Sequence, residues 1–337
     1  MEKSSKVCVT GGAGYLGSWL VKKLLERGHI VHATLRSLDD PSKVGLLKSL
    51  PDEDTRLLLF EADIYNPDEF ERAIEGCEFV FHVATPKQHN NQSSQYKDTS
   101  EAAVAGVESI VKSCIRSGTV KRLIYTASVM AASPLKEDGT GFKDCMDESC
   151  WTPLNLSFPY SNDYTMGYIR SKTLAEKEVL SYNGNGGLEV VTLACGLVGG
   201  DTLLPYIPLS VLAIVSQITG SLSNYHNLCL LQEELGSVPL VHIDDVCEAH
   251  VFCMENISSV HGRFLCATTY PTITEIRNYY RENYPELGVT EESLEGPGRG
   301  IGCCSRKLLD MGFEYKYDMK KILDGSVECA RRQGVLN

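Results

Sequence analysis

Long apolar runs and blocks of positive charge are missing from this sequence of 337 residues. The longest apolar stretch, Leu203 to Val215, is interrupted by prolines and a tyrosine and is too short to span a bilayer. Lysine and arginine total 32 against 44 aspartates and glutamates, which gives a net charge of −12. We therefore expect neither a membrane-spanning segment nor a nucleic-acid partner.

The 13 cysteines form no regularly spaced framework. Neither Cys145 with Cys150 nor Cys303 with Cys304 is accompanied by a second His or Cys cluster at zinc-like spacing, so no metal is predicted. The first residues, Met1 to Lys6, contain no apolar secretory region. We expect a cytoplasmic protein whose cysteines are free thiols.

Strands and helices alternate through the first half of the chain, which predicts an α/β fold with a Rossmann-type, doubly wound parallel sheet. The predicted strands span 6–10, 30–35, 56–61, 78–83, 120–127, 188–193 and 239–243, and the predicted helices 14–27, 41–50, 67–75, 99–117, 164–182 and 245–255. Beyond residue 200 the alternation breaks down. We expect a dinucleotide-binding domain over 1–200, to which 238–268 returns, and a smaller, mostly C-terminal substrate-binding lobe formed by 201–237 and 269–337.

A glycine-rich turn follows the first predicted strand. Gly11, Gly14 and Gly17 recur every three residues, after Val7 and Val9 and before leucines at helical spacing. Such glycines permit a tight turn, a close approach of backbone to a pyrophosphate, and close packing of helix on sheet. The helix N-terminus that follows attracts phosphates. The pattern predicts a dinucleotide site.

The residues after the second and third strands bear on the choice of cofactor. Arg36 lies 19 residues beyond Gly17 and has no acid beside it, whereas NAD sites usually place an Asp or Glu near this position. A guanidinium there favours the 2′-phosphate of NADP(H), and Lys43 adds positive charge. The alternative is that Arg36 is a solvated surface residue. Asp63 either reaches the adenine or caps the helix that starts near Pro67.

Two further elements point to acid–base chemistry. Tyr168 and Lys172 are four residues apart on a predicted helix and so share a face. A nearby ammonium favours a phenolate and lowers a pKa that is about 10 when unperturbed. Ser128 ends the fifth strand, where open α/β sheets present residues to ligands. These residues predict proton transfer by Tyr168 to a carbonyl oxygen bound by Ser128.

Longer motifs surround these residues over nearly the whole chain. They are Val9–Trp19, Thr34–Arg36, Phe79–Pro86, Val120–Ser128, Tyr168–Lys177, Val241–Val246 and Gly312–Tyr317. In them the sequence resembles the extended short-chain dehydrogenase/reductase family, and within it the plant group of dihydroflavonol reductases, anthocyanidin reductases and related carbonyl reductases. The resemblance implies an NADPH-dependent reductase with a Ser128–Tyr168–Lys172 triad, in which Lys172 also holds the nicotinamide ribose. It further implies cofactor contacts from Tyr15, Leu16, Ile64, Val83, Ala84 and Thr85.

The implied substrate is an aromatic, flavonoid-like compound or another plant specialised metabolite, reduced at a carbonyl or conjugated carbon, with anthocyanidin reductase-like proteins as the nearest match. Dihydroflavonol reductases carry a specificity asparagine five residues after the catalytic serine, where this chain has Ser133. Met130, Tyr164, Pro205 and Tyr206 are the other candidates for the substrate pocket.

Other functions remain open from the sequence. One is an NADP(H)-binding sensor or scaffold without turnover, and another is a sugar-nucleotide epimerase, which Arg36 disfavours because an epimerase retains NAD. His82 and His242 are interpreted as structural histidines, and Asp244 with Asp245 as a helix cap. We expect a small-molecule substrate and a monomer or homodimer.

Overall fold

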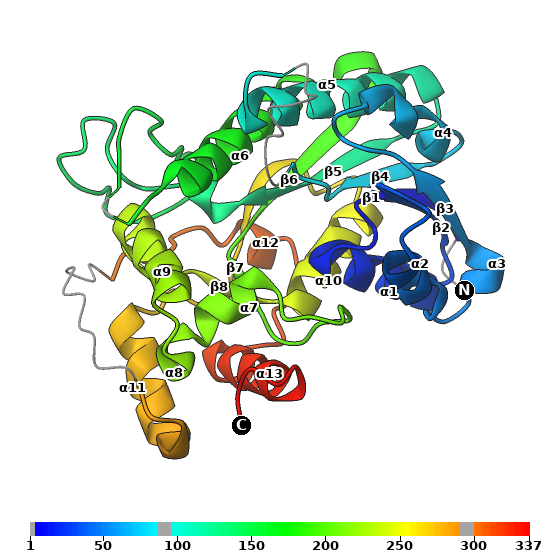
Figure 1. Cartoon of the computed structure of the whole chain (residues 1–337). Helices are drawn as coiled ribbons and strands as arrows, with labels where there is room; N and C mark the ends of the chain where they lie inside the picture. Colours follow the sequence, from blue (N-terminus) through cyan, green and yellow to red (C-terminus); the bar gives the residue numbers. More distant parts are fainter. Residues whose placement is uncertain (1–3, 87–95, 159, 290–299) are drawn as a thin grey trace. The chain divides into compact units, whose positions relative to one another are not determined.

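The structure is a computed structural model, and it describes residues 4–86, 96–158, 160–289 and 300–337. It contains a seven-stranded sheet with the strand order β3-β2-β1-β4-β5-β6-β9 (Figure 1). The strands are β1 (Lys6–Thr10), β2 (Ile30–Leu35), β3 (Leu57–Glu61), β4 (Phe79–His82), β5 (Arg122–Ser128), β6 (Glu189–Cys195) and β9 (Gly262–Cys266). Pairing is parallel from β3 through β2, β1 and β4 to β5. The predicted fold class is confirmed.

Helices cover both faces of this sheet. Helix α1 (Tyr15–Glu26) lies on one face, and α4 (Glu71–Ile74) and α5 (Thr99–Ser117) lie on the other (Figure 1). Each buries an apolar stripe, such as Leu20, Val21 and Leu24 of α1, against the sheet. The other helices here are α2 (Pro41–Lys48) and the short α3 (Glu53–Arg56). The predicted helix over 67–75 is in fact a 3-10 turn followed by α4.

Two compact units can be distinguished, each formed by separate stretches of chain. The first contains 1–127, 170–193 and 247–264, and the second contains 128–169, 194–246 and 265–337. Two helices contribute to both units: α6 (Asp163–Ser181) and α10 (Ile243–Glu255). The second unit thus includes residues 128–169, which the sequence-based division had assigned to the dinucleotide-binding domain.

The second unit is built around a two-stranded parallel sheet of β7 (Leu197–Gly199) and β8 (Leu240–His242). Helices α7 (Leu209–Ile214) and α13 (Met319–Arg332) pack against these strands (Figure 1). The remaining helices are α8 (Ser216–Thr219), α9 (Leu222–Leu235), α11 (Ile273–Asn283) and α12 (Lys307–Asp310). No helix among the described residues is long and apolar enough to cross a membrane.

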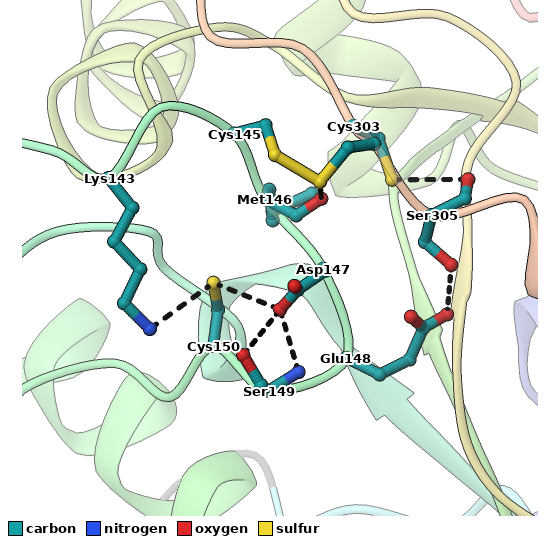
Figure 2. The surroundings of a disulfide bond; sticks show 10 residues. Lys143, Cys145, Met146, Asp147, Glu148, Ser149, Cys150, Cys303 and Ser305 are labelled. Carbon is teal, nitrogen blue, oxygen red and sulfur yellow. Dashed lines mark hydrogen bonds between the residues drawn. A yellow bond between two sulfur atoms is a disulfide. The ribbon is translucent and has the colours of Figure 1, made fainter.

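The expectation that every cysteine is a free thiol is wrong for two of them. Cys145 and Cys304 form a disulfide, whereas the other 11 cysteines are free (Figure 2). The main chain brings the two segments together, because Met146 donates its N–H to Gly302 at 3.0 Å and accepts that of Cys304 at 3.1 Å. Sequence spacing could not reveal this pairing, since 159 positions separate the two cysteines. In the described part of the chain, no group of three or more His, Cys, Asp or Glu residues could hold a metal ion.

Candidate active site

The glycine turn has the geometry that its spacing predicts. Gly11 has a φ of +68°, and its carbonyl accepts the N–H of Gly14 at 3.0 Å. A Cβ at Gly17 would overlap the Gly11 carbonyl oxygen, so only glycine fits there. Gly14 is the N-cap residue of α1, and as a glycine it has no side chain with which to cap the helix. The first turn of α1, which begins with Tyr15 and Leu16, contains no acidic residue, so this N-terminus suits a phosphate.

Hydrogen bonds from neighbouring strands hold this turn in place. Gly11 donates its N–H to the Thr34 hydroxyl at 3.1 Å, which joins the turn to β2. The Thr10 hydroxyl accepts the N–H groups of Val83 and Ala84, both at 3.0 Å, which joins β1 to the residues after β4. The carboxyl ends of parallel strands meet at one edge of a sheet, so these residues together form the edge at which open α/β sheets bind ligands.

The residues predicted to select the cofactor follow β2 and β3. Arg36 is exposed, and within the described part of the chain its guanidinium makes no hydrogen bond or ion pair. Lys43, by contrast, pairs with Asp40 at 2.9 Å, which offsets the positive charge that it would bring to a phosphate. The same pairing lowers the pKa of Asp40 below its ordinary value. Arg36 is therefore the better candidate for a 2′-phosphate.

Asp63 does not cap the helix near Pro67. Its carboxylate accepts the N–H of Tyr65 at 3.1 Å, and its own N–H is donated to Glu69 at 2.8 Å. Asn66 is instead the N-cap residue of that 3-10 turn, and its side chain makes no capping hydrogen bond to a described residue. The rival role as a helix cap is thus wrong, and the role at the adenine stays a prediction.

Lys172 lies in a narrow hollow of the first unit. Its Nζ donates to the Thr85 hydroxyl at 2.8 Å and to the Thr126 carbonyl at 2.9 Å, and it lies 5.2 Å from the centre of the Tyr125 ring. Other predicted cofactor residues line the same hollow, among them Ile64, Ala84 and Thr85. The ammonium is therefore held at the carboxyl ends of β4 and β5 by polar groups of both.

Ser128 and Tyr168 meet in the second unit. The Tyr168 side chain hydrogen-bonds to that of Ser128, which opposes the effect of burial on its acidity. Burial nonetheless raises the pKa of Tyr168 above its usual value, in contrast to the lowering expected from Lys172. The reason is that desolvation of the phenol raises the pKa by more than the hydrogen bond with Ser128 lowers it. A raised pKa keeps the proton on Tyr168 at neutral pH, which suits a proton donor.

Helix α6 carries both Tyr168 and Lys172, one turn apart on the same side. Near its start, Asn162 accepts the N–H of Thr165 at 2.9 Å, and the Thr165 hydroxyl accepts that of Asn162 at 2.8 Å. Farther along, the buried Glu176 carboxylate receives a two-pronged bond from Arg263, at 2.9 and 3.1 Å. The first pair of bonds caps the start of α6, and the bond from Arg263 ties the C-terminal half of α6 to β9.

The candidate substrate residues differ in accessibility. Tyr164, Pro205 and Tyr206 are exposed, and Met130 is half-buried. Ser133 is fully buried, and its hydroxyl donates to the Glu234 carbonyl and accepts the N–H of Leu135 at 3.1 Å. The Ser133 hydroxyl is thus already occupied by main-chain groups. A substrate contact from any of these residues stays a prediction.

The His242 region has structural roles. The His242 ring stacks on Tyr317 with a centroid distance of 3.6 Å, and its Nδ1 accepts the N–H of Asp244 at 3.1 Å. Asp245 is not a helix cap, because α10 already begins at Ile243 and the Asp245 carboxylate accepts the N–H groups of Lys316 and Tyr317, at 3.0 and 3.2 Å. Its partners lie about 70 positions away, so the local sequence could not reveal them.

Comparison with known proteins agrees with this geometry. Residues 7–266 match the model of the NAD dependent epimerase/dehydratase family, which is more than half of the chain. The chain belongs to this family. A putative anthocyanidin reductase from Ginkgo biloba is 37% identical over 335 residues, covering 99% of this chain and 96% of that protein. A dihydroflavonol 4-reductase from Callistephus chinensis is 36% identical over 333 residues, covering 98% and 87%.

The crystal structure of vestitone reductase from alfalfa, Medicago sativa, matches the structure of this chain with a TM-score of 0.80. The two chains are 35% identical, and the match covers 99% of this chain and 100% of the alfalfa protein. These relatives are reductases, so the prediction of an oxidoreductase of the extended short-chain type is confirmed over the sensor and epimerase alternatives. The family description also confirms that the cofactor is a nicotinamide dinucleotide.

The roles of some residues in the site of this protein could not be predicted from the sequence. Thr126 holds Lys172 through its main-chain carbonyl, a group that every residue possesses. Thr34 accepts the N–H of Gly11 through its hydroxyl, a contact with a residue 23 positions away that the Thr34–Arg36 motif does not predict. Thr85, predicted to line the cofactor groove, in addition accepts a hydrogen bond from Lys172.

Proposed function

We propose that this protein is an NADPH-dependent reductase that reduces a carbonyl or conjugated carbon of an aromatic, flavonoid-like substrate. The observation that carries the proposal is the hydrogen bond between Tyr168 and Ser128, on the helix that also presents Lys172 one turn later. A phenol with a raised pKa, paired with a hydroxyl, is suited to give a proton to a substrate oxygen.

The residues of the first unit fit a dinucleotide. The Gly11–Gly17 turn is so tight that a Cβ at Gly17 would overlap the Gly11 carbonyl oxygen, and the N-cap residue of α1 is Gly14, which has no side chain to compete with a phosphate for the helix N–H groups. Arg36 is exposed at the position where a 2′-phosphate would lie, and no acid neighbours it in the sequence. These features support NADPH over NADH. When bound, NADPH supplies the hydride.

The chain's own residues supply the proton and the orientation. Tyr168 donates its phenolic proton to the oxygen of the carbonyl that is being reduced, and later regains a proton from water. Ser128 binds the same oxygen through its hydroxyl. Lys172, held by Thr85 and Thr126, orients the ribose of the cofactor and stabilises the phenolate that Tyr168 becomes.

The substrate class rests on the relatives. An anthocyanidin reductase and a dihydroflavonol 4-reductase match almost the whole chain, and a vestitone reductase shares its fold at 35% identity. All three names denote flavonoid-type compounds. Identity of 35–37% over almost the whole chain supports this class of substrate.

The test is oxidation of NADPH in the presence of a panel of anthocyanidins, dihydroflavonols, isoflavanones and simple aromatic ketones, with products identified by mass spectrometry. We expect turnover of at least one flavonoid and a clear preference for NADPH. Tight NADPH binding with no turnover of any compound would instead support a sensor. Co-purified NAD would support an epimerase.

A further inference from the structure

His250 is a buried histidine of the first unit that the proposed mechanism does not use. It belongs to α10 and is almost completely buried. Its Nε2 lies 2.8 Å from the hydroxyl oxygen of Thr126, and the two side chains share a hydrogen bond. Thr126 is also buried and belongs to β5, so this bond joins the helix to the sheet. Breaking the bond is costly, because it removes the partner of a polar group that water does not reach.

Thr126 holds the Lys172 ammonium through its other polar group. Its main-chain carbonyl accepts a hydrogen bond from Lys172 Nζ at 2.9 Å. The register of β4 with β5 ends where His82 lies opposite Tyr125, one residue before Thr126. This carbonyl thus lies just beyond the last register pair with β4. Its position therefore depends on the other contacts that Thr126 makes.

The contacts of His250 and of Lys172 lie on opposite faces of the sheet. Side chains alternate along a strand, so Tyr125 and Thr126 point to opposite faces. Lys172 Nζ lies 5.2 Å from the centre of the Tyr125 ring, on one face. His250 meets the Thr126 side chain on the other face. This part of β5 is thus held from both faces, by α10 on one and by the ammonium on the other.

A second anchor joins β5 to the chain just after α10. Arg122, the first residue of β5, donates from Nη2 to the Ile257 carbonyl at 2.7 Å. Arg122 and Thr126 are four positions apart in the strand, so their side chains point to the same face. Loss of the His250 bond would therefore leave the start of β5 anchored and release the part that carries the Lys172 contact.

We propose that His250 is a positioning residue, which through Thr126 determines where the Lys172 ammonium lies. This inference rests on the proposed function, because it takes Lys172 to bind the ribose of NADPH and to stabilise the phenolate of Tyr168. Without the bond the Thr126 carbonyl can shift, and the ammonium shifts with it. The affinity for NADPH and kcat should then both fall, because one ammonium serves both.

Two variants break the bond from its two sides. Thr126→Val removes the hydroxyl but keeps the branched side chain and the main-chain carbonyl, and His250→Leu removes the imidazole. Each should weaken NADPH binding and lower kcat about 3- to 10-fold, the effect of one net hydrogen bond. His250→Gln keeps a polar group within reach of Thr126 and should restore both quantities to within about twofold of the wild type.

His32→Leu is the matched control. His32 is also a buried histidine of the first unit, in β2, and its Nδ1 hydrogen-bonds to the Ala73 carbonyl at 2.7 Å. Its loss should lower the free energy of unfolding, measured with urea, without changing NADPH affinity or kcat.

Lys172→Met separates positioning of the ammonium from general support of the fold. In this background Thr126→Val should cause no further loss of NADPH affinity, because the ammonium that the bond positions is absent. A merely structural role would give the same loss with and without Lys172. Cofactor fluorescence measures the dissociation constants and needs no substrate.

Wild-type NADPH affinity in Thr126→Val overturns the proposal, and so does a loss that persists in full in the Lys172→Met background. A His32→Leu variant with the same loss of affinity also overturns it, even if His250→Leu fails to fold. So does a His250→Gln variant that binds NADPH as weakly as Thr126→Val. The proposed function fails separately, if Tyr168→Phe keeps its activity.

Discussion

The Thr10 hydroxyl lies 2.9 Å from Nδ1 of His82 and accepts two main-chain N–H groups, from Val83 and Ala84. With both of its lone pairs engaged, the hydroxyl can direct its proton only to His82. Nδ1 is therefore an acceptor and the ring is neutral. Burial, and then the charge of Lys172, lower the pKa of His82 to about 3. This histidine joins β1 to β4 and holds the residues after β4 in place.

The depressed pKa of His82 predicts an acid-sensitive fold. Above pH 6.5, the usual histidine pKa, the ring is neutral in both the folded and the unfolded chain. As the pH falls from 6.5 toward 3, His82 binds a proton in the unfolded chain but stays neutral in the folded protein. The free energy of unfolding should therefore decrease, by up to about 1.4 kcal/mol per pH unit from this group.

Urea unfolding of the wild type and of His82→Asn at several pH values between 7.5 and 4 measures this effect. Asparagine keeps an acceptor for Thr10 but does not titrate, so the stability of the variant should depend less on pH, by about one proton. Equal pH dependence of the two proteins would contradict a neutral His82.

Arg36 should discriminate between the two cofactors. Arg36→Ala should weaken NADPH binding far more than NADH binding, because only NADPH carries the 2′-phosphate. One charge-assisted hydrogen bond is worth about 1.5–3 kcal/mol, or roughly 10- to 150-fold in affinity. Lys43→Ala is the matched control and should have a smaller effect, since Lys43 already pairs with Asp40. The dissociation constants can be measured by cofactor fluorescence. An equal loss of affinity for NADPH and for NADH would show that Arg36 does not bind the 2′-phosphate.

Tyr168→Phe should abolish proton donation while preserving the packing of the ring. We expect kcat to fall at least ~10²-fold, with cofactor affinity close to that of the wild type. Steady-state kinetics and NADPH titration together measure both quantities. Should the variant reduce its substrate at nearly the wild-type rate, another group must donate the proton.

Lys172→Met should impair both turnover and cofactor binding. The ammonium holds Thr85 and the Thr126 carbonyl in the described structure, and in the proposed mechanism it serves both the ribose and Tyr168. A methionine fills similar space without the charge. Kinetics at saturating NADPH separate the two effects. A variant that loses affinity for NADPH but recovers full kcat at saturation would show that Lys172 does not assist Tyr168.

The disulfide should stabilise the second unit. Since 159 positions separate Cys145 from Cys304, the entropy of the closed loop sets an upper value of about 5 kcal/mol for the stability lost in Cys145→Ser or Cys304→Ser. Cys303→Ser is the control, because Cys303 is a free thiol next to the bond (Figure 2). Urea unfolding without reductant should separate these variants, and reductant should bring the wild type close to Cys145→Ser. If reductant left the free energy of unfolding of the wild type unchanged, this result would argue against the Cys145–Cys304 disulfide.

The sequence by itself determined the features that depend on local spacing. The glycines at 11, 14 and 17 predict the turn, because the positive φ of Gly11 and the contact that a Cβ at Gly17 would make with the Gly11 carbonyl admit no side chain at these two positions. Alternating strands and helices predicted β2 over Ile30–Leu35 and α5 over Thr99–Ser117 with the bounds that the structure has. The four-residue separation of Tyr168 and Lys172 likewise follows from the helix period.

Tertiary structure alone decided how residues far apart in the chain affect one another. The local sequence carries no trace of the pairing of Cys145 with Cys304 or of Asp245 with the backbone near Lys316. The acidity of Tyr168 was predicted with the wrong sign for the same reason. A helix period shows which charge is near, but desolvation depends on every segment that packs around the phenol, and desolvation is the largest cause of the raised pKa of Tyr168.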